Sequence, residues 1–329
     1  MTQIVMKNVS KRFRRYKKKK GFINNFFNRE YESVSAINDI DISIKEGEIV
    51  GLLGTNGAGK TTIMKMLSGL IEPSSGEINV LGVNPFKKKV SFKKEISLVL
   101  GQKQQLWWDI PAIESFELNK SIYGIEDEQY RQVLNNLVEM LDIYDVINSP
   151  VRTLSLGERM KCELVAALLH SPKILFLDEP TIGLDLLAQK KIRDFIKEYN
   201  KKFNATVIIT SHYMNDIEEL CDRTIFINKG TKHYDGTLNG FLDLYGKECV
   251  LNIEFLEILD GDKQLALGKY GTIIKAIDNT CKLKVDKEKS SEIKKMLLSN
   301  NSVNMITIDQ MDASEIVRSY FEKENVGHV

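Results

Sequence analysis

GTNGAGKTT, the stretch from Gly54 to Thr62, is the most informative part of this sequence. It follows the apolar run GEIVGLL, which ends at Leu53 and is typical of a buried strand. It precedes TTIMKMLSGL, whose apolar residues recur at helical spacing. Glycine is costly to order, so three glycines in nine residues indicate that something must approach this backbone closely. We therefore expect a strand, a loop and a helix in succession.

The same stretch predicts a phosphate-binding loop. It matches the pattern G-x-x-x-x-G-K-[ST] at Gly54, Gly59, Lys60 and Thr61. In such a loop a row of backbone N–H groups wraps the phosphates, and a misplaced Cβ would block them. We expect Lys60 to reach the terminal phosphates, Thr61 to offer its hydroxyl to Mg²⁺, and the helix to point its positive end at the anion. A turn that merely joins strand to helix would explain the glycines but not the Lys-Thr pair.

Two adjacent acids form a second element. The apolar run ILFLDEP ends in Asp178 and Glu179, which repel each other and resist burial. A metal ion would remove that difficulty: Asp178 would hold Mg²⁺, and Glu179 would polarise a water for attack on the γ-phosphorus. A surface turn before Pro180 would be a fair alternative if the phosphate loop were absent.

Composition limits the class of protein. The chain has 329 residues, of which 43% are hydrophobic, and this length suits two domains. A net charge of +1 excludes a globally basic nucleic-acid coat. The four cysteines form no C-x-x-C pair, so reduced cytosolic thiols are expected. No apolar run approaches the ~20 residues that span a bilayer, so any span would belong to another chain.

Strand and helix patterns alternate along most of the chain, which favours a mainly parallel α/β sheet. The helix-rich stretch from about 102 to 170 interrupts that alternation and predicts a helical subdomain. The apolar spacing between Glu128 and Tyr144 predicts an amphipathic helix. The pattern changes after Gly230, where a small α+β domain is expected. We predict an ATP-binding domain over 1–238 and an accessory domain over 239–329.

The sequence LSLGERM, from Leu154 to Met160, lies between the phosphate-binding loop and the Asp178–Glu179 pair. With it, residues 1 to about 235 resemble the nucleotide-binding subunits of ABC transporters. GTNGAGKTT is similar to their Walker A motif, ILFLDEP to Walker B, LSLGE to the signature motif and IGLD (182–185) to the D-loop. His212 resembles the switch histidine. More narrowly, the chain resembles ATPase subunits of ABC-2-type exporters. The implied fold is a P-loop NTPase with a mainly parallel sheet, an antiparallel β part and a helical subdomain.

The resemblance implies that two copies face head to tail and sandwich two ATP molecules. Ser155 and the Gly157 backbone would cap the γ-phosphate of the opposite copy, His212 would contact that phosphate, and Asp185 would lie at the interface or cap a helix. The residues implied for the nucleotide are Phe13, Gly54, Asn56, Gly57, Ala58, Gly59, Lys60, Thr61, Thr62, Gln102, Ser155, Gly157, Glu158 and Asp185. Those implied for Mg²⁺ are Thr61, Gln102 and Asp178, and those for catalysis are Lys60, Glu179 and His212.

Some positions depart from the family pattern. The commonest signature has glycine third and glutamine fifth, where this chain has Leu156 and Glu158. A direct ligand role is therefore weaker for Glu158, which could contact the sugar or the loop instead. Alignment favours Gln102 as the Q-loop residue, with Gln104 or Gln105 as alternatives. For the aromatic residue that stacks on adenine, Phe13 is the first candidate.

Two alternatives concern aromatic residues. Tyr31 is a second candidate for the adenine stack. Trp107 and Trp108 follow the Q-loop, where the family contacts its membrane partner, and we expect one to be buried and one to face that partner.

A basic insert covers about residues 14–32. Residues 11–20 alone hold eight basic side chains and no acidic one. The insert could touch the anionic cytoplasmic leaflet, dock on the membrane subunit, or remain a solvated loop.

The expected function is that of an energy-coupling ATPase that drives separate transmembrane permease subunits, outward by subfamily resemblance. It would use ATP and Mg²⁺, form a homodimer or a heterodimer with a related ATPase subunit, and bind no nucleic acid. It would lie peripherally on the cytoplasmic face of the cell membrane. The alternatives are a soluble ABC ATPase acting on the ribosome or DNA, and a non-catalytic regulatory module, against which intact Glu179 and His212 argue.

Overall fold

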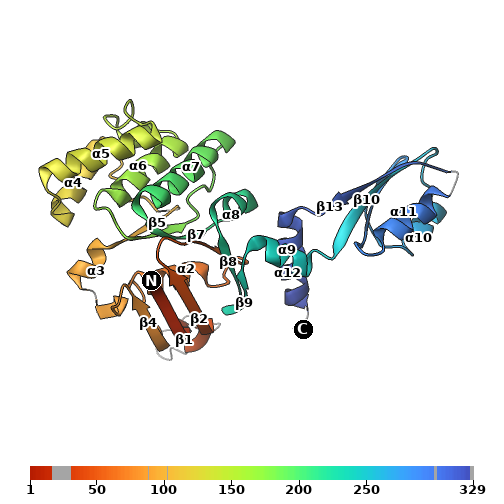
Figure 1. The fold of residues 1–329 in the computed structure, drawn as a ribbon, viewed down its shortest axis with the longest axis horizontal. Coiled ribbons are helices and arrows are strands. Elements are labelled where there is room, and N and C mark those ends of the chain that lie inside the picture. Colours follow the sequence, from red (N-terminus) through yellow and green to blue (C-terminus); the bar gives the residue numbers. More distant parts are fainter. Residues whose placement is uncertain (17–30, 88, 102, 300–301, 327–329) are drawn as a thin grey trace, which may run out of the picture. The chain divides into compact units, whose positions relative to one another are not determined.

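The structure is a computed structural model that describes residues 1–16, 31–87, 89–101, 103–299 and 302–326. The chain divides into two compact units, Met1–Thr237 and Leu238–Val329 (Figure 1). Within the described residues, no helix is long and apolar enough to cross a membrane. The predicted Q-loop residue Gln102 and most of the basic insert, residues 17–30, lie outside the described residues.

The first unit is built on a six-stranded sheet in the order β5-β6-β7-β3-β8-β9. All neighbouring strands run parallel except β8 and β9. Every residue of β3 and β7 is buried, as expected for parallel strands covered on both faces. The strands are β3 (Ile49–Leu53), β5 (Ile96–Leu100), β6 (Ile174–Asp178), β7 (Thr206–Thr210), β8 (Arg223–Asn228) and β9 (Thr231–Gly236).

The two faces of this sheet pack into different layers (Figure 1). Leu175 and Leu177 of β6 lie in a core with the helices α4 to α7. Phe176, which points the other way, lies in a core with α2 and the strands β1 and β2. The helices and turns are α2 (Lys60–Leu67), η1 (Pro85–Lys87), α3 (Val90–Lys94), α4 (Ala112–Tyr123), α5 (Asp127–Leu141), η2 (Val151–Thr153), α6 (Leu156–Leu168), α7 (Leu186–Phe203) and α8 (Met214–Leu220).

A separate three-stranded antiparallel sheet, in the order β2-β1-β4, completes the first unit. Its inward side chains, such as Ile4 and Ile42, are almost fully buried against α2. Together these layers confirm the predicted fold class: a mainly parallel sheet, an antiparallel β part and a helical layer. The strands are β1 (Thr2–Tyr16), β2 (Tyr31–Lys45) and β4 (Ser75–Val80).

One predicted helix is shorter than expected. The pattern from Glu128 to Tyr144 forms α5, which ends at Leu141. Asp142 takes a left-handed conformation with φ of 53° and closes the helix. The apolar spacing is therefore confirmed but its last turn is not helical.

The second unit is an antiparallel sheet in the order β11-β12-β10-β13 with helices α10 and α11 on its buried face. Helices α9 and α12 pack together through Phe241, Tyr245 and Tyr320. The elements are α9 (Leu238–Tyr245), β10 (Glu248–Phe255), α10 (Gly261–Leu267), β11 (Thr272–Ile277), β12 (Thr280–Asp286), α11 (Ser290–Leu298), β13 (Val303–Gln310) and α12 (Ala313–Val326).

Candidate active site

The loop between β3 and α2 has a shape that only glycine permits. Gly59 is the N-cap of α2 with φ of 113°, and Gly57 has φ of 78°. A Cβ on Gly54 would lie 2.1 Å from the carbonyl oxygen of Ile227. The first turn of α2 holds no acidic residue and no side-chain cap, so its N–H groups remain available to an anion.

Lys60 lies across this loop. Its side chain is 7% exposed, and Nζ donates hydrogen bonds to the carbonyl oxygens of Gly54 (2.7 Å) and Thr55 (3.1 Å). Burial lowers the pKa of Lys60, and the negative charges of Glu179 and Asp178 oppose this shift. The ammonium group is thus held at the mouth of the phosphate loop by backbone dipoles.

Asp178 ends β6 between two hydroxyl groups. Thr61 Oγ1 donates to its Oδ2 at 2.8 Å, and Thr210 Oγ1 donates to its Oδ1 at 2.7 Å. Thr210 was not predicted from the sequence, although it ends β7, which pairs with β6. The carboxyl ends of neighbouring parallel strands meet at one edge of a sheet, and this rule could have found it.

Glu179 and His212 form a hydrogen-bonded pair beside Asp178. His212 Nε2 lies 2.8 Å from Glu179 Oε1. Glu179 has a left-handed backbone with φ of 57°, and its amide N–H donates to Thr210 Oγ1 at 3.0 Å. Among the described residues its other oxygen, Oε2, is buried and meets no hydrogen-bond partner. A non-glycine residue in this conformation at an unpaired carboxylate indicates a functional position.

These groups surround one hollow of about 550 Å³. It could take an anion at the amides of α2. Its lining residues are Ala36, Asn56, Gly57, Ala58, Gly59, Lys60, Thr61, Thr62, Glu179, Ile182 and His212. Gly54 and Asp178 lie next to the lining through their bonds to Lys60 and Thr61.

The signature turn, residues 154–158, is closed by a capping box at the start of α6. The Ser155 amide donates to Glu158 Oε2 at 2.8 Å, and the Ser155 hydroxyl donates to the same oxygen at 2.7 Å. Bonds from the hydroxyl and then the amide of Ser155 lower the pKa of Glu158. The carboxylate therefore faces its own turn, and a ligand role for Glu158 stays a prediction.

The signature turn contacts the start of α7. A Cβ on Gly157 would lie 3.0 Å from Ala188 Cβ. Asp185 is the N-cap of α7 and accepts a hydrogen bond from the Ala188 amide at 2.8 Å. The four predicted residues Ser155, Gly157, Glu158 and Asp185 are all described, and none lines the hollow of its own chain.

Comparison with known proteins identifies the family. A family model described as ABC transporter matches residues 37–182. The ABC transporter ATP-binding protein NatA of Bacillus subtilis (strain 168) is 34% identical over 217 residues, which make up 66% of this chain and 88% of NatA. The chain belongs to the ATP-binding proteins of ABC transporters. It is an ABC ATPase. The glycine-lined hollow is where its ATP is expected to bind, and it is called the ATP hollow below.

Other similar proteins agree with this assignment. The bacitracin transport ATP-binding protein BcrA of Bacillus licheniformis is 36% identical over 200 residues, which are 61% of this chain and 64% of BcrA. A solved ATP-binding subunit of an ABC transporter aligns with a TM-score of 0.61 at 24% identity, covering 74% of this chain and 93% of that subunit. The structural likeness supports the fold of the ABC ATPase.

The two aromatic candidates, Phe13 and Tyr31, are not among the residues that line the ATP hollow. Phe13 on β1 is 39% exposed and pairs with Val34, two residues before Ala36, which lines the hollow. Tyr31, at the start of β2, is 58% exposed. Neither of these described residues lines the hollow, so the adenine stack stays a prediction for both.

The alternative Q-loop residues of the ABC ATPase differ in their surroundings. Both glutamines are exposed, and the Gln105 side chain donates to the Leu98 carbonyl at 2.8 Å. The expectation that one tryptophan is buried is wrong: Trp107 is 60% exposed and Trp108 is 44% exposed. Both rings project from a segment whose backbone is bonded to the helical layer, so neither reaches the core.

A buried polar cluster behind the ATP site was also not predicted. Asp216 on α8 is fully buried and accepts hydrogen bonds from Thr181 Oγ1 (2.5 Å), Ser211 Oγ (2.5 Å) and Arg193 Nη1 (3.0 Å). Thr181 follows Glu179 by two residues, and Ser211 precedes His212. Asp216 therefore connects the two loops that carry the Glu179–His212 pair.

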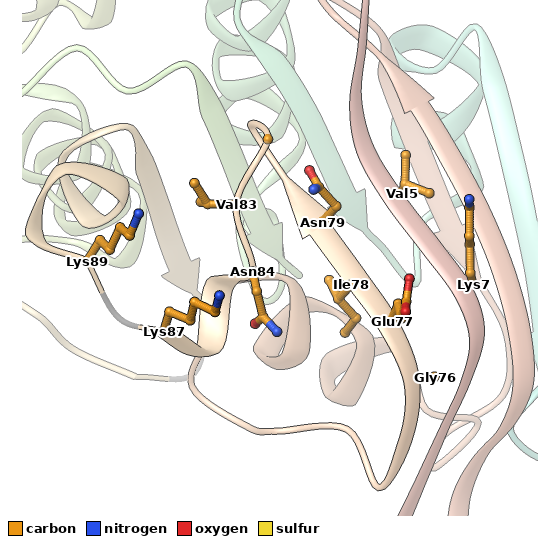
Figure 2. A pocket seen from close by; sticks show the side chains of 11 residues that line it. Val5, Lys7, Gly76, Glu77, Ile78, Asn79, Val83, Asn84, Lys87 and Lys89 are labelled. Carbon is orange, nitrogen blue, oxygen red and sulfur yellow. The ribbon is translucent and has the colours of Figure 1, made fainter.

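A second hollow, of about 630 Å³, lies elsewhere on the ABC ATPase. Figure 2 shows that it is formed by β1, β4 and the turn after β4, with Lys7, Lys87 and Lys89 around it. It shares no lining residue with the ATP hollow and has no glycine-lined helix start. Its size alone does not make it the reaction site.

Proposed function

We propose that this ABC ATPase is the ATP-hydrolysing subunit of an ABC-2-type exporter and drives a separate membrane permease. The proposal is supported by relatives such as the bacitracin transport protein BcrA and the linearmycin resistance ATP-binding protein LnrL of Bacillus subtilis (strain 168). The alternative of a soluble ATPase acting on the ribosome or DNA finds no support among these relatives.

The observation that carries the proposal is the pair of Glu179 and His212 at the mouth of the phosphate loop. One oxygen of Glu179 lies 2.8 Å from the imidazole, and the other, which has no hydrogen-bond partner among the described residues, would take a proton from an attacking water. Lys60 and the amides at the start of α2 would hold the β- and γ-phosphates. A general base next to a phosphate cradle is the arrangement that hydrolysis of ATP needs.

Mg²⁺ would be held by Thr61 and Asp178, whose oxygens are already 2.8 Å apart. When bound with the triphosphate, the ion neutralises charge on the phosphate oxygens. Gln102 would complete this set by the family resemblance. Thr210 keeps Asp178 turned toward Thr61 through its bond to the second carboxylate oxygen.

A second copy would complete each ATP site. Ser155, Gly157 and Asp185 do not line the hollow of their own chain, which supports a role at the nucleotide of a partner. That partner would be a second copy or a related ATPase subunit. The closed dimer would be favoured by contacts that exist only when ATP lies between the two surfaces. By the same resemblance, the dimer would lie on the cytoplasmic face of the membrane.

We also propose that residues 1–238 form the ATP-binding domain and residues 239–329 an accessory domain. The family match over 37–182 falls entirely within the first compact unit, Met1–Thr237.

The test uses the full chain, with Lys60→Ala and Glu179→Gln variants. We expect the parent to release phosphate from Mg·ATP, Lys60→Ala to lose this activity, and Glu179→Gln to form an ATP-dependent dimer without turnover. Lys65→Ala, on the same helix, is the matched control and should keep the parent rate. Phosphate release measures the rate of ATP hydrolysis, and sedimentation velocity measures formation of the dimer. A Lys60→Ala chain that hydrolyses ATP at the parent rate would contradict the proposal.

A further inference from the structure

The segment 103–109, which follows Gln102, is bound to the signature helix α6 through a buried carboxylate. Glu163 on α6 is 4% exposed. Its Oε1 and Oε2 accept the Gln105 amide N–H at 3.0 and 3.1 Å, and Oε1 accepts the Leu106 amide at 3.4 Å. Hydrogen bonds from amides to a buried carboxylate are strong and directional. Their removal would leave two backbone donors of the segment without this acceptor.

A second side chain of α6 contacts the exposed part of the same segment. Arg159, one helical turn before Glu163, places its guanidinium carbon 5.8 Å from the centroid of the Trp108 ring. Residues four apart share a helix face, so both contacts come from one side of α6. The segment is thus attached to α6 at the amides of Gln105 and Leu106 and again at the ring of Trp108.

Other bonds of the segment also lead to the helical layer. The Trp107 amide donates to Ser115 Oγ of α4 at 3.2 Å. The Trp108 carbonyl accepts the Arg152 amide at 2.9 Å, just before the signature turn. Two bonds lead to β5 of the sheet: the Lys103 amide donates to the Leu100 carbonyl and the Gln105 side chain donates to the Leu98 carbonyl, each at 2.8 Å. The segment therefore bonds to both the sheet and the helical layer, and most of its hydrogen bonds go to the helical layer.

We propose that Glu163 is a positioning residue that makes segment 103–109 move with the signature turn. Nucleotide contacted by Ser155 and Gly157 would then change the surroundings of Trp107 and Trp108, which are largely exposed. The inference rests on the proposed function, because only closure against a partner brings nucleotide to the signature turn. Glu163 itself lines no part of the ATP hollow, so it acts through α6 rather than on ATP.

The first test measures the contact in the full chain without nucleotide. Glu163→Ala should raise hydrogen exchange at the Gln105 and Leu106 amides by about tenfold, with β6 unchanged. Glu139→Ala, an exposed acid on α5, is the matched control and should leave both amides at the parent rate. If Glu163→Ala does not fold, Glu163→Gln keeps the shape and one acceptor, and a smaller rise is expected. Unchanged exchange in a folded variant would overturn the inference.

The second test uses the two tryptophans, which are the whole tryptophan content of the chain. In a Glu179→Gln background, Mg·ATP should change their emission over the same concentrations at which the dimer forms. Adding Glu163→Ala should preserve dimer formation but remove most of the emission change, and Glu139→Ala should preserve both. The inference would be overturned if the Glu163→Ala dimer showed the full change in tryptophan emission, or if the parent dimer showed no change in emission. A parent that never dimerises would instead refute the proposed function, and the inference would fall with it.

Discussion

His212 Nε2 lies 2.8 Å from Glu179 Oε1, although the two residues are 33 positions apart in the sequence. They meet because β6 and β7 are parallel neighbours whose carboxyl ends lie at one edge of the sheet. Thr210, at the end of β7, holds the Glu179 amide and the Asp178 carboxylate together. Among the described residues, Glu179 Oε2 is buried and has no hydrogen-bond partner.

Replacing His212 by alanine removes the group that orients Glu179. We expect the maximal rate of ATP hydrolysis to fall by about 10²-fold or more, because general-base catalysis depends on a positioned carboxylate. Affinity for ATP should change little, since the phosphate loop is intact. Steady-state kinetics and nucleotide binding separate the two effects. Tyr213→Phe, at the next position, serves as the control, and a His212→Ala chain with parent turnover would refute this role.

Replacing Asp216 by asparagine breaks a buried charge pair. The side chains of Arg193 and Asp216 are 8% and 0% exposed, with Nη1 and Oδ1 3.0 Å apart. Arg193 would keep its contact with Glu219 Oε2 at 3.2 Å but lose its fully buried partner, so the free energy of unfolding should fall by about 3 kcal/mol. Urea denaturation measures this change.

Turnover should fall further than stability alone explains, because Asp216 also holds the loops of Thr181 and Ser211. The control is Lys191→Gln, which breaks the exposed pair with Asp142 and should cost less than about 1 kcal/mol. If breaking the buried pair and breaking the exposed pair lowered the free energy of unfolding equally, the buried polar cluster around Asp216 would have no special role in stability.

The capping box at Ser155 should make stability depend on pH. Hydrogen bonds from Ser155 lower the pKa of Glu158 below its ordinary 4.5. The ionised carboxylate therefore stabilises the fold above about pH 4.5, and this contribution is lost as pH falls through the lowered pKa. Glu158→Ala should cost less than about 1 kcal/mol at neutral pH, because the group is partly exposed.

The difference in melting temperature between the parent and Glu158→Ala should narrow as pH falls below about 4.5. Thermal denaturation between neutral and acidic pH measures it. Glu139→Ala, without a capping role, should show no such narrowing. A constant difference across this range would exclude the ionised cap.

Adding one methyl group to the phosphate loop should disrupt it. In Gly54→Ala the new Cβ would lie 2.1 Å from the Ile227 carbonyl oxygen, so the backbone must move. We expect a loss of about 3 kcal/mol in the free energy of unfolding and loss of ATP binding. Gly261→Ala, where nothing lies within 4 Å of the new Cβ, is the control and should be close to neutral. Normal ATP binding by Gly54→Ala would show that the loop tolerates a side chain.

A chain that ends at Thr237 should fold and bind ATP, because the first compact unit has its own two cores. Circular dichroism and nucleotide titration check this expectation. Failure of the shortened chain to fold would mean that the accessory domain is needed for the stability of the ATP-binding domain.

Contiguous motifs made much of the fold and the phosphate loop predictable. The glycines, Lys60 and Thr61 act within a few residues of one another, so their spacing alone describes the loop. The continuous apolar runs of β3 and β6 likewise predict strands whose two faces are both covered. The helix-rich stretch from about 102 to 170 predicted the helical layer, whereas the antiparallel sheet of the first unit was expected only from the family resemblance.

Contacts between distant residues could not be predicted in the same way. Asp216 meets Thr181 and Arg193, Glu163 meets the Gln105 amide, and the ring of Trp108 lies outside the core. Local spacing describes how a backbone can wrap a phosphate, because that geometry is made within one turn of chain. Which buried charge finds which partner depends on how the layers pack, and only the folded chain brings those atoms within hydrogen-bond distance.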